Sequence, residues 1–93
     1  MPKDQGEYRR LERIVKGFAS YRRLQVLDLL KQTPGLSIEG IAEKLGMGYM
    51  NASDHLRKMA IAGLLYKRSD GMNVRHTLTP RAESILAFCK KLK

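Results

Sequence analysis

The chain has 93 residues, which suits one domain with a single modest core. It carries 18 Lys and Arg against 9 Asp and Glu, a net charge of +9, and a surplus of this size favours a polyanionic partner, nucleic acid or an anionic membrane surface. No apolar run approaches a membrane span, the N-terminus lacks the apolar core of a signal peptide, and one cysteine cannot form an internal disulfide. We therefore expect a cytoplasmic protein that does not enter a membrane.

The first element that the sequence predicts is a helix over 7–18, which follows a short polar stretch at 1–6. That stretch contains proline and glycine, so we expect a flexible tail and a single domain over 7–93. Apolar residues at helical spacing define the helix, and these residues are Leu11, Ile14, Val15 and Phe18.

Two further helices follow, each with a serine in the capping position. Ser20 can cap a helix over 21–32, and the Thr-Pro-Gly sequence at 33–35 stops it because proline cannot continue the helical hydrogen bonds. Ser37 can cap a helix over 38–45, and the glycine that follows provides a C-terminal stop. This pair of helices precedes a tight turn.

A fourth helix is predicted after the turn at 47–48, and it ends at Gly63. The residues expected to face the core are Ala52, Leu56, Met59 and Ala60. The pattern then changes, because residues 64–80 favour strands either side of the Asp70-Gly71 dipeptide, a strong hairpin signal that is most simply turn chemistry. We expect one covered face on this hairpin, formed by Tyr66, Val74, His76 and Leu78.

The last predicted element is a helix over 81–93. Thr79 can cap it, and Pro80 stands where the first helical turn accepts a proline. The predicted order is helix, helix, helix, helix, hairpin, helix, which is a mainly α fold with a small β-hairpin. Two short helices joined by a tight turn and followed by a basic hairpin predict a winged helix-turn-helix.

Several segments resemble the ArsR-type bacterial and archaeal repressors. LERIVKGFASYRRLQVLDLL at 11–30 resembles their entry segment, SIEGIAEKLGM at 37–47 their first helix-turn-helix element, and ASDHLRKMAIAGLLYKR at 52–68 their recognition helix and wing entry. HTLTPRAESIL at 76–86 is similar to the wing exit of the related MarR-type repressors. The resemblance spans about 11–86 and implies a winged-helix fold, binding to double-stranded DNA, and a homodimer that pairs first and last helices. It does not indicate the operator, the regulated gene or an inducer.

The fourth helix presents a polar face opposite its apolar one, as a helix that enters a major groove would. Asparagine can grip adenine through two hydrogen bonds, and arginine or lysine can meet guanine or phosphate. Phosphate contacts from this helix and from the hairpin would fix the register without reading sequence. A solvated polar face is the structural alternative. The residues predicted to bind DNA are Lys44, Tyr49, Asn51, Ser53, Asp54, His55, Arg57, Lys58, Lys67, Arg68 and Arg75.

Asp54 is unexpected in this helix, because ArsR-type repressors usually have a basic or neutral residue there. Its carboxylate can accept a hydrogen bond from cytosine N4 and so read a base. Alternatively its negative charge near the start of the helix interacts favourably with the helix dipole and pairs with Arg57 or Lys58 on the next turn. Gly48 is a second departure, since the resembled family often has a serine cap at that place.

The two terminal helices carry apolar residues over a wider arc than one small core can cover. A self-complementary patch of this kind normally closes by two-fold symmetry, so we expect a homodimer. The resemblance to the ArsR-type proteins further implies a transcriptional repressor that blocks a promoter. The predicted interface residues are Leu11, Ile14, Val15, Phe18, Ile85, Phe88, Cys89 and Leu92.

The sequence offers no recognisable metal site, cofactor site or catalytic motif, so we expect neither a cofactor nor an enzyme. One cysteine and two distant histidines do not form a tetrahedral nitrogen/sulfur site. We interpret His55 as a groove or helix-packing residue, His76 as a wing-strand residue, and Cys89 as a small hydrophobe of the core or interface, with a redox role as the alternative. The alternative function is a winged-helix module that binds protein or RNA.

Overall fold

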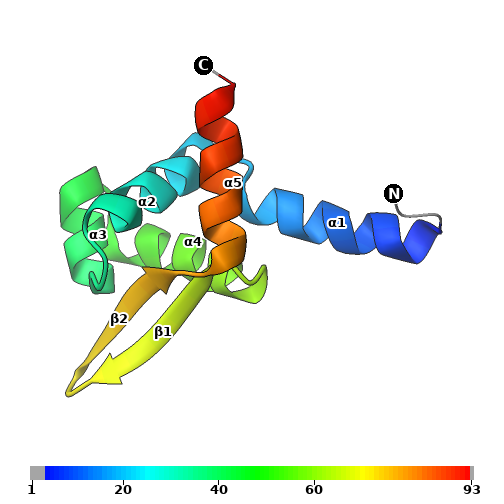
Figure 1. Cartoon of the computed structure of the whole chain (residues 1–93). Helices are drawn as coiled ribbons and strands as arrows, with labels where there is room; N and C mark the ends of the chain where they lie inside the picture. The colour runs from blue at the N-terminus through cyan, green and yellow to red at the C-terminus, as the bar shows by residue number, and fades with distance from the viewer. Residues whose placement is uncertain (1–3, 93) are drawn as a thin grey trace.

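The computed structural model describes residues 4–92 and has the predicted order of elements (Figure 1). The elements are α1 (Gln5–Phe18), α2 (Tyr21–Gln32), α3 (Ile38–Leu45), α4 (Tyr49–Ile61), β1 (Leu65–Asp70), β2 (Asn73–Leu78) and α5 (Pro80–Lys91). The helix-turn-helix pair is α3 and α4, and the β1–β2 hairpin that follows is the wing, so the fold is a winged helix-turn-helix.

Side-chain caps fix where most of the helices begin. The predicted caps of α2, α3 and α5 each accept a backbone hydrogen bond, and they are Ser20, Ser37 and Thr79. The α1 helix begins two residues earlier than predicted, because Asp4 caps it by accepting the Glu7 amide at 2.8 Å. The predicted tail is therefore too long: Gln5 and Gly6 are helical, and residues 1–3 lie outside the described residues.

The core lies where α2, α4 and α5 meet above the inner end of the wing. Ala52, Leu56 and Met59 of α4 are fully buried as predicted, and Ala60 is half-buried against the same cluster. Two ion pairs clamp α5 to α2 at the surface, Lys31–Glu83 at 3.0 Å and Lys90–Asp28 at 3.8 Å. Among residues 4–92, no helix combines the length and the apolar content needed to cross a membrane.

The α1 helix joins this body only near its C-terminal end. Gly17 is its one buried residue, and a Cβ built there would collide with the Cβ of Ala62, at the C-cap of α4. The glycine therefore permits a close approach that a side chain would prevent. The rest of α1 projects from the body as an arm (Figure 1).

The wing forms as predicted, but its loop lies one residue later. Asp70 pairs with Asn73, which places Gly71 and Met72 in the two-residue loop. Gly71 has a φ of +64°, as the first loop position of a type II′ turn requires, and a side chain there would be strained.

The covered face of the wing differs from the prediction at Tyr66 and Val74. Tyr66 pairs with Thr77 and is 57% exposed, because successive strand residues point to opposite faces and its neighbour Leu65 faces the core opposite Leu78. Val74 shares the face of His76, but it is exposed because the outer half of the wing projects beyond the core. The core covers only the base of the hairpin.

His76 ties that base to the loop between α2 and α3. Its ring Nδ1 lies 3.0 Å from the Leu36 carbonyl oxygen, and its backbone amide donates to the same oxygen at 3.1 Å. The Gly35 amide donates in turn to the His76 carbonyl at 2.9 Å, and Leu36 forms an isolated antiparallel bridge with His76. The helix-turn-helix and the wing are thus held as one unit.

Candidate nucleic-acid interface

The α4 helix offers one polar face to solvent. Its N-cap is Gly48, which provides no side-chain cap, so the first-turn amides receive no acceptor from that residue. The predicted contacts divide by exposure: Asp54, Ser53 and His55 are half-buried, whereas the exposed ones are Tyr49, Asn51, Arg57 and Lys58. Met50, which was not among the residues predicted to bind DNA, is 78% exposed between Tyr49 and Asn51.

Asp54 pairs with both cations of the following turn. Its Oδ1 accepts from Arg57 Nη2 at 2.8 Å, and its Oδ2 lies 3.0 Å from Lys58 Nζ. The hydrogen bond from Lys58, followed by that from Arg57, holds the pKa of Asp54 below its ordinary value of 3.8. Asp54 is therefore ionised at neutral pH, and both of its oxygens are occupied. This is the intrahelical pairing that the sequence analysis left as one of two roles.

His55 points toward α2 and not directly away from the body. Its Nδ1 accepts a hydrogen bond from Arg23 Nε at 3.1 Å, and Arg23 Nη1 donates to the Lys16 carbonyl of α1 at 2.7 Å. One arginine thus links the arm, α2 and α4. Burial, with the positive charge of Arg23 adding to it, lowers the pKa of His55 below 6.5. His55 packs helices together in this structure, and its contact with DNA stays a prediction.

The two histidines predict a loss of stability in mild acid. Burial also lowers the pKa of His76, although the Leu36 carbonyl opposes the shift. Below about pH 6.5 the two histidines therefore bind protons in the unfolded chain that they do not bind in the folded protein. The free energy of unfolding should fall as pH drops from 7.5 to 5. Urea denaturation at both pH values measures this fall. The double variant His55→Gln/His76→Gln should lose most of the pH dependence, and an unchanged dependence in that variant would contradict the assignment.

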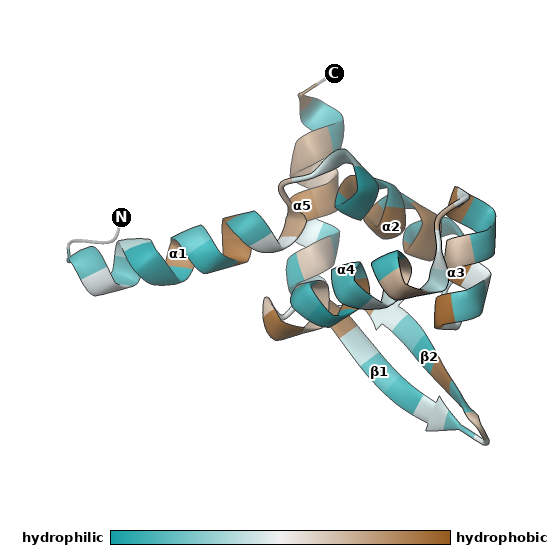
Figure 2. Ribbon diagram, turned by 180° about the vertical axis from the view of Figure 1, so that it is seen from behind, coloured by the Kyte–Doolittle hydropathy of each residue, from teal (hydrophilic) through white to brown (hydrophobic). Residues whose placement is uncertain are grey.

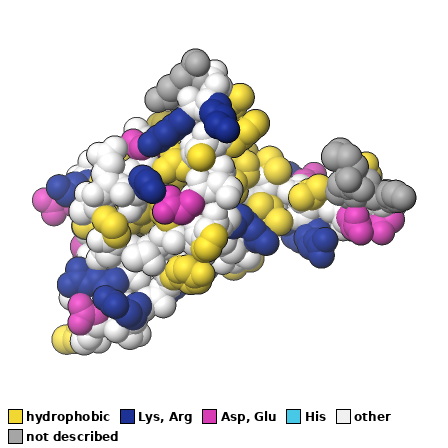
Figure 3. Space-filling model, in the orientation of Figure 1, with side chains coloured by type: hydrophobic (Ala, Val, Ile, Leu, Met, Phe, Trp, Pro, Cys, Tyr) yellow, Lys and Arg dark blue, Asp and Glu magenta, His cyan; other side chains and the backbone are white. Residues whose placement is uncertain are grey.

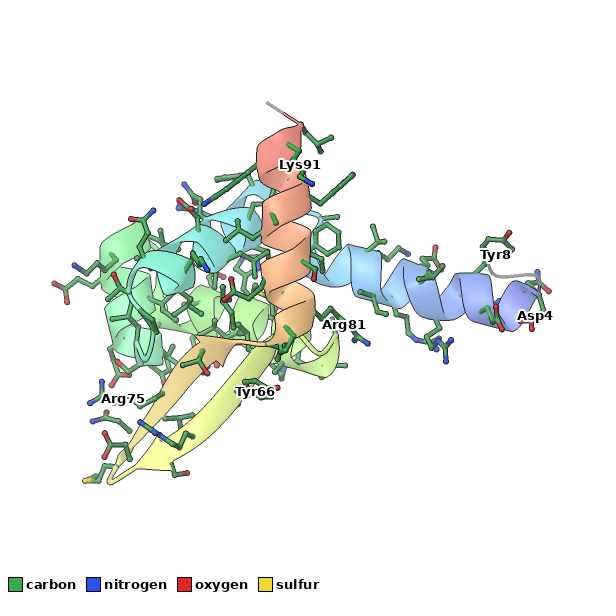
Figure 4. All side chains as sticks on the ribbon, viewed as in Figure 1. Asp4, Tyr8, Tyr66, Arg75, Arg81 and Lys91 are labelled. Atoms are coloured by element: carbon green, nitrogen blue, oxygen red, sulfur yellow. The ribbon has the colours of Figure 1, made fainter. Side chains whose placement is uncertain are left out.

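The wing carries three predicted cations, and they differ in how firmly they are held. Arg75 is fixed by Asp70, whose Oδ2 lies 3.1 Å from its Nε, and by the Gly35 carbonyl, which accepts from its Nη1 at 3.2 Å (Figure 4). Lys67 and Arg68 are exposed and, as strand neighbours, point to opposite faces of the hairpin. The wing therefore presents cations on both faces, with Arg75 pre-positioned at its outer half.

Lys44 extends this surface onto α3. It lies in the last turn of that helix and is exposed, next to the Gly46 stop that begins the turn into α4. All of the predicted cations of α3, α4 and the wing are thus at least partly accessible. Figure 3 shows Lys and Arg side chains gathered on the wing, and a second group along the lower edge of the arm. That second group was not among the sequence predictions.

An apolar surface follows α1 and α5. An open groove separates the two helices and is lined in part by Leu11, Ile14 and Ile85. In Figure 3 hydrophobic side chains gather in the angle between α1 and α5, and the hydropathy colouring shows apolar turns along α5 (Figure 2). Half-buried members of the predicted interface are Ile14, Phe18, Ile85 and Cys89; exposed members are Leu11, Val15, Phe88 and Leu92. Tyr8, half-exposed one turn before Leu11, adds to this surface.

Within residues 4–92, no three His, Cys, Asp or Glu side chains come together in a way that could hold a metal ion. Cys89 is a half-buried free thiol on α5, beside a shallow depression that Leu24 and Leu86 also line. Its surroundings are those of a small hydrophobe that packs at the edge of the core.

Comparison with known proteins gives consistent results. The family model described as "MarR family" matches residues 20–77. The HTH-type transcriptional regulator Rv0324 of Mycobacterium tuberculosis is 41% identical over 59 residues, which cover 63% of this chain and 26% of that protein. The chain thus spans about a quarter of the length of this curated relative.

Two solved structures share the fold over nearly the whole chain. One is the homodimeric winged helix-turn-helix DNA-binding domain of a possible ArsR-family regulator from Mycobacterium bovis, with TM-score 0.85, 27% identity, and coverage of 99% of this chain and 87% of that one. The other is NolR from Sinorhizobium fredii, with TM-score 0.85, 22% identity, and coverage of 99% and 95%. The resemblance to ArsR- and MarR-type proteins predicted from the sequence is confirmed.

Proposed function

This chain belongs to the MarR family, and we propose that it is a homodimeric repressor that binds specific sequences in duplex DNA. The family and the fold are those of DNA-binding transcription regulators. The observation that carries the proposal is the exposed polar face of α4, which stands beside a basic wing and is backed by a rigid core.

In this proposal α4 enters the major groove with its N-terminal half against base edges. Asn51 lies in the first turn, where it can grip adenine, and the uncapped amides behind Gly48 can donate to a phosphate. Lys67 and Arg68 reach the phosphates beside the groove from the two faces of the wing. Two copies related by a two-fold axis would place their α4 helices about 34–36 Å apart on an inverted repeat, and occupation of such a site at a promoter would exclude polymerase.

Selection of bound sequences from random duplex DNA, followed by a salt titration on the selected site, tests the function. We expect an inverted repeat and an affinity that falls steeply with salt, with a slope near −0.9 for each phosphate neutralised. An RNA duplex should bind more weakly, since its deep, narrow major groove does not admit α4. A flat salt dependence for DNA, or equal binding to RNA without sequence preference, would favour the alternative of an RNA- or protein-binding module.

Asn51→Ala should separate a base-reading residue from a phosphate contact. Loss of the amide should relax preference at one base position and cost roughly 1–3 kcal/mol of binding on the selected site. Lys67→Ala should instead weaken all sequences about equally and make the salt slope shallower by about 0.9 per protomer. Fluorescence anisotropy on the selected site and on single-base variants of it measures both. If Asn51→Ala binds every duplex as the parent does, the protein does not read bases through Asn51.

Asp54→Asn tests the role of the ion pairs on α4. The substitution keeps the size of the side chain but removes the single negative charge that now pairs with both Arg57 and Lys58. If the role is structural, affinity for unrelated DNA should rise and the salt slope should steepen, while base preference stays unchanged. A changed preference at one base pair, measured by repeating the sequence selection, would assign Asp54 to base readout instead.

A further inference from the structure

A basic cleft of about 410 Å³ lies between the arm helix α1 and the C-terminal end of α4. Among residues 4–92, no Asp or Glu lines it, whereas six cationic side chains do: Arg10, Arg13, Lys16, Arg23, Lys58 and Arg81. They come from four different helices. A concentration of like charge of this kind favours an anion that can neutralise it.

Four of the six cations already have partners. Lys58 pairs with Asp54, Lys16 lies 3.4 Å from Glu12, and Arg23 holds His55, while Arg81 donates to the Ala62 carbonyl at 2.8 Å (Figure 4). The other two, Arg10 and Arg13, make no ion pair or side-chain hydrogen bond within the described part of the chain, 4–92. They are the charges that remain available to a ligand.

The contact between α1 and α4 places these two arginines beside the C-terminal end of α4. Arg13 and Arg10 precede Gly17 by four and seven residues, so they lie on the side of α1 that contacts Ala62. Leu11 and Val15 lie on a different side of the same helix, because each residue turns the helix by about 100°. A partner that covers the apolar side of α1 therefore leaves the arginine side open.

We propose that this cleft binds the phosphate backbone of the same DNA that α4 reads, with Arg10 and Arg13 as phosphate ligands. The inference rests on the proposed function, and Lys58 provides the physical link, because it is exposed on α4 and also lines the cleft. The cleft is an open extension of the α4 surface, so a continuous polyanion can cross it. Since α1 would lie near the two-fold axis of the dimer, the contacted phosphates are those between the two half-sites.

The double variant Arg10→Gln/Arg13→Gln tests the inference on the full chain, with the duplex selected by the parent as the probe. The salt slope should become shallower by about 1.8 per protomer, and hydroxyl-radical protection should be lost at the centre of the site while base preference is kept. Lys90→Gln/Lys91→Gln is the matched control: it removes two charges at the outer end of α5, where Lys91 lies far from the wing (Figure 4), breaks only the exposed 3.8 Å pair of Lys90 with Asp28, and should leave the slope unchanged. Circular dichroism and sedimentation verify that both variants fold and associate as the parent does.

If the double arginine variant keeps the parent's salt slope and its central footprint, the role of the cleft is overturned, while DNA binding by α4 stands. Failure of the parent to bind any duplex would instead remove the proposed function, and the inference with it. Equal losses in the arginine variant and the lysine control would show a general effect of net charge and would also overturn the site.

Discussion

Phe88→Asp is expected to convert the protein into a monomer whose affinity for its operator is about 10²–10⁴-fold weaker. Phe88 is 60% exposed on α5, so the substitution leaves the core of the protomer intact. In the proposed dimer the same side chain is covered, and a carboxylate there would lose its water without gaining a partner. The affinity falls because each half-site must then be bound independently. Sedimentation at micromolar concentration and anisotropy on the full operator measure the two effects.

Ala87→Asp is the control for this result, because it adds the same charge one position away, on an exposed part of α5. It should remain dimeric. Ile85, which the sequence places with Phe88 in the interface, is a poorer test because it also packs against the core, and a charge there would destabilise the protomer itself. A parent that sediments as a monomer both free and on DNA would rule out the dimer.

Leu56→Ala is expected to lower the free energy of unfolding by about 2–5 kcal/mol, through lost burial and the cavity left behind. Leu56 is only 1% exposed and packs the inner side of α4 against the core. For a domain of this size the loss is a large fraction of the total stability, which is typically about 5–15 kcal/mol. DNA binding should fail at temperatures where the parent still binds, because α4 loses its support. Thermal and urea denaturation measure the loss.

Arg57→Ala, at the next position, gives the complementary result. Arg57 is exposed and, within the described residues 4–92, pairs with Asp54 alone, so its loss should alter DNA affinity with little change in stability. A Leu56→Ala variant that lost less than about 1 kcal/mol would mean that the core closes around the smaller side chain.

Local chemistry made most of the fold predictable from the sequence. The serines at 20 and 37 and the threonine at 79 cap helices through local hydrogen bonds, and the starts of α2, α3 and α5 follow from them. The covered face of the wing was less predictable, since alternation alone does not say which of two adjacent residues faces the core. Leu65 pairs with Leu78 and faces inward with it, and a two-residue loop places Leu65 on that face whether the loop is at 70–71 or at 71–72.

The candidate site was less predictable because its side chains find partners far away in the sequence. The bond between Arg23 and His55 joins residues 32 positions apart, and no local pattern announces it. The pairing of Asp54, by contrast, was foreseeable because residues three and four apart share a helix face. The arginines at 10 and 13 were missed since a basic helix face ordinarily indicates solvent exposure, and only the approach of α1 to Ala62 brings them beside α4.

The contact between Gly17 and Ala62 attaches α1 to the body at one end, so a small change of angle there moves the other end of the helix a long way. Gln5 lies twelve residues before Gly17, about 18 Å along the helix axis, so a tilt of about 10° moves the far end by about 3 Å, close to the rise of one base pair. In the proposed dimer, the angle that these two small residues set for α1 determines the distance between the two α4 helices. A change at either residue could therefore retune which operators the regulator accepts, and so which genes it controls, without altering any side chain that touches a base.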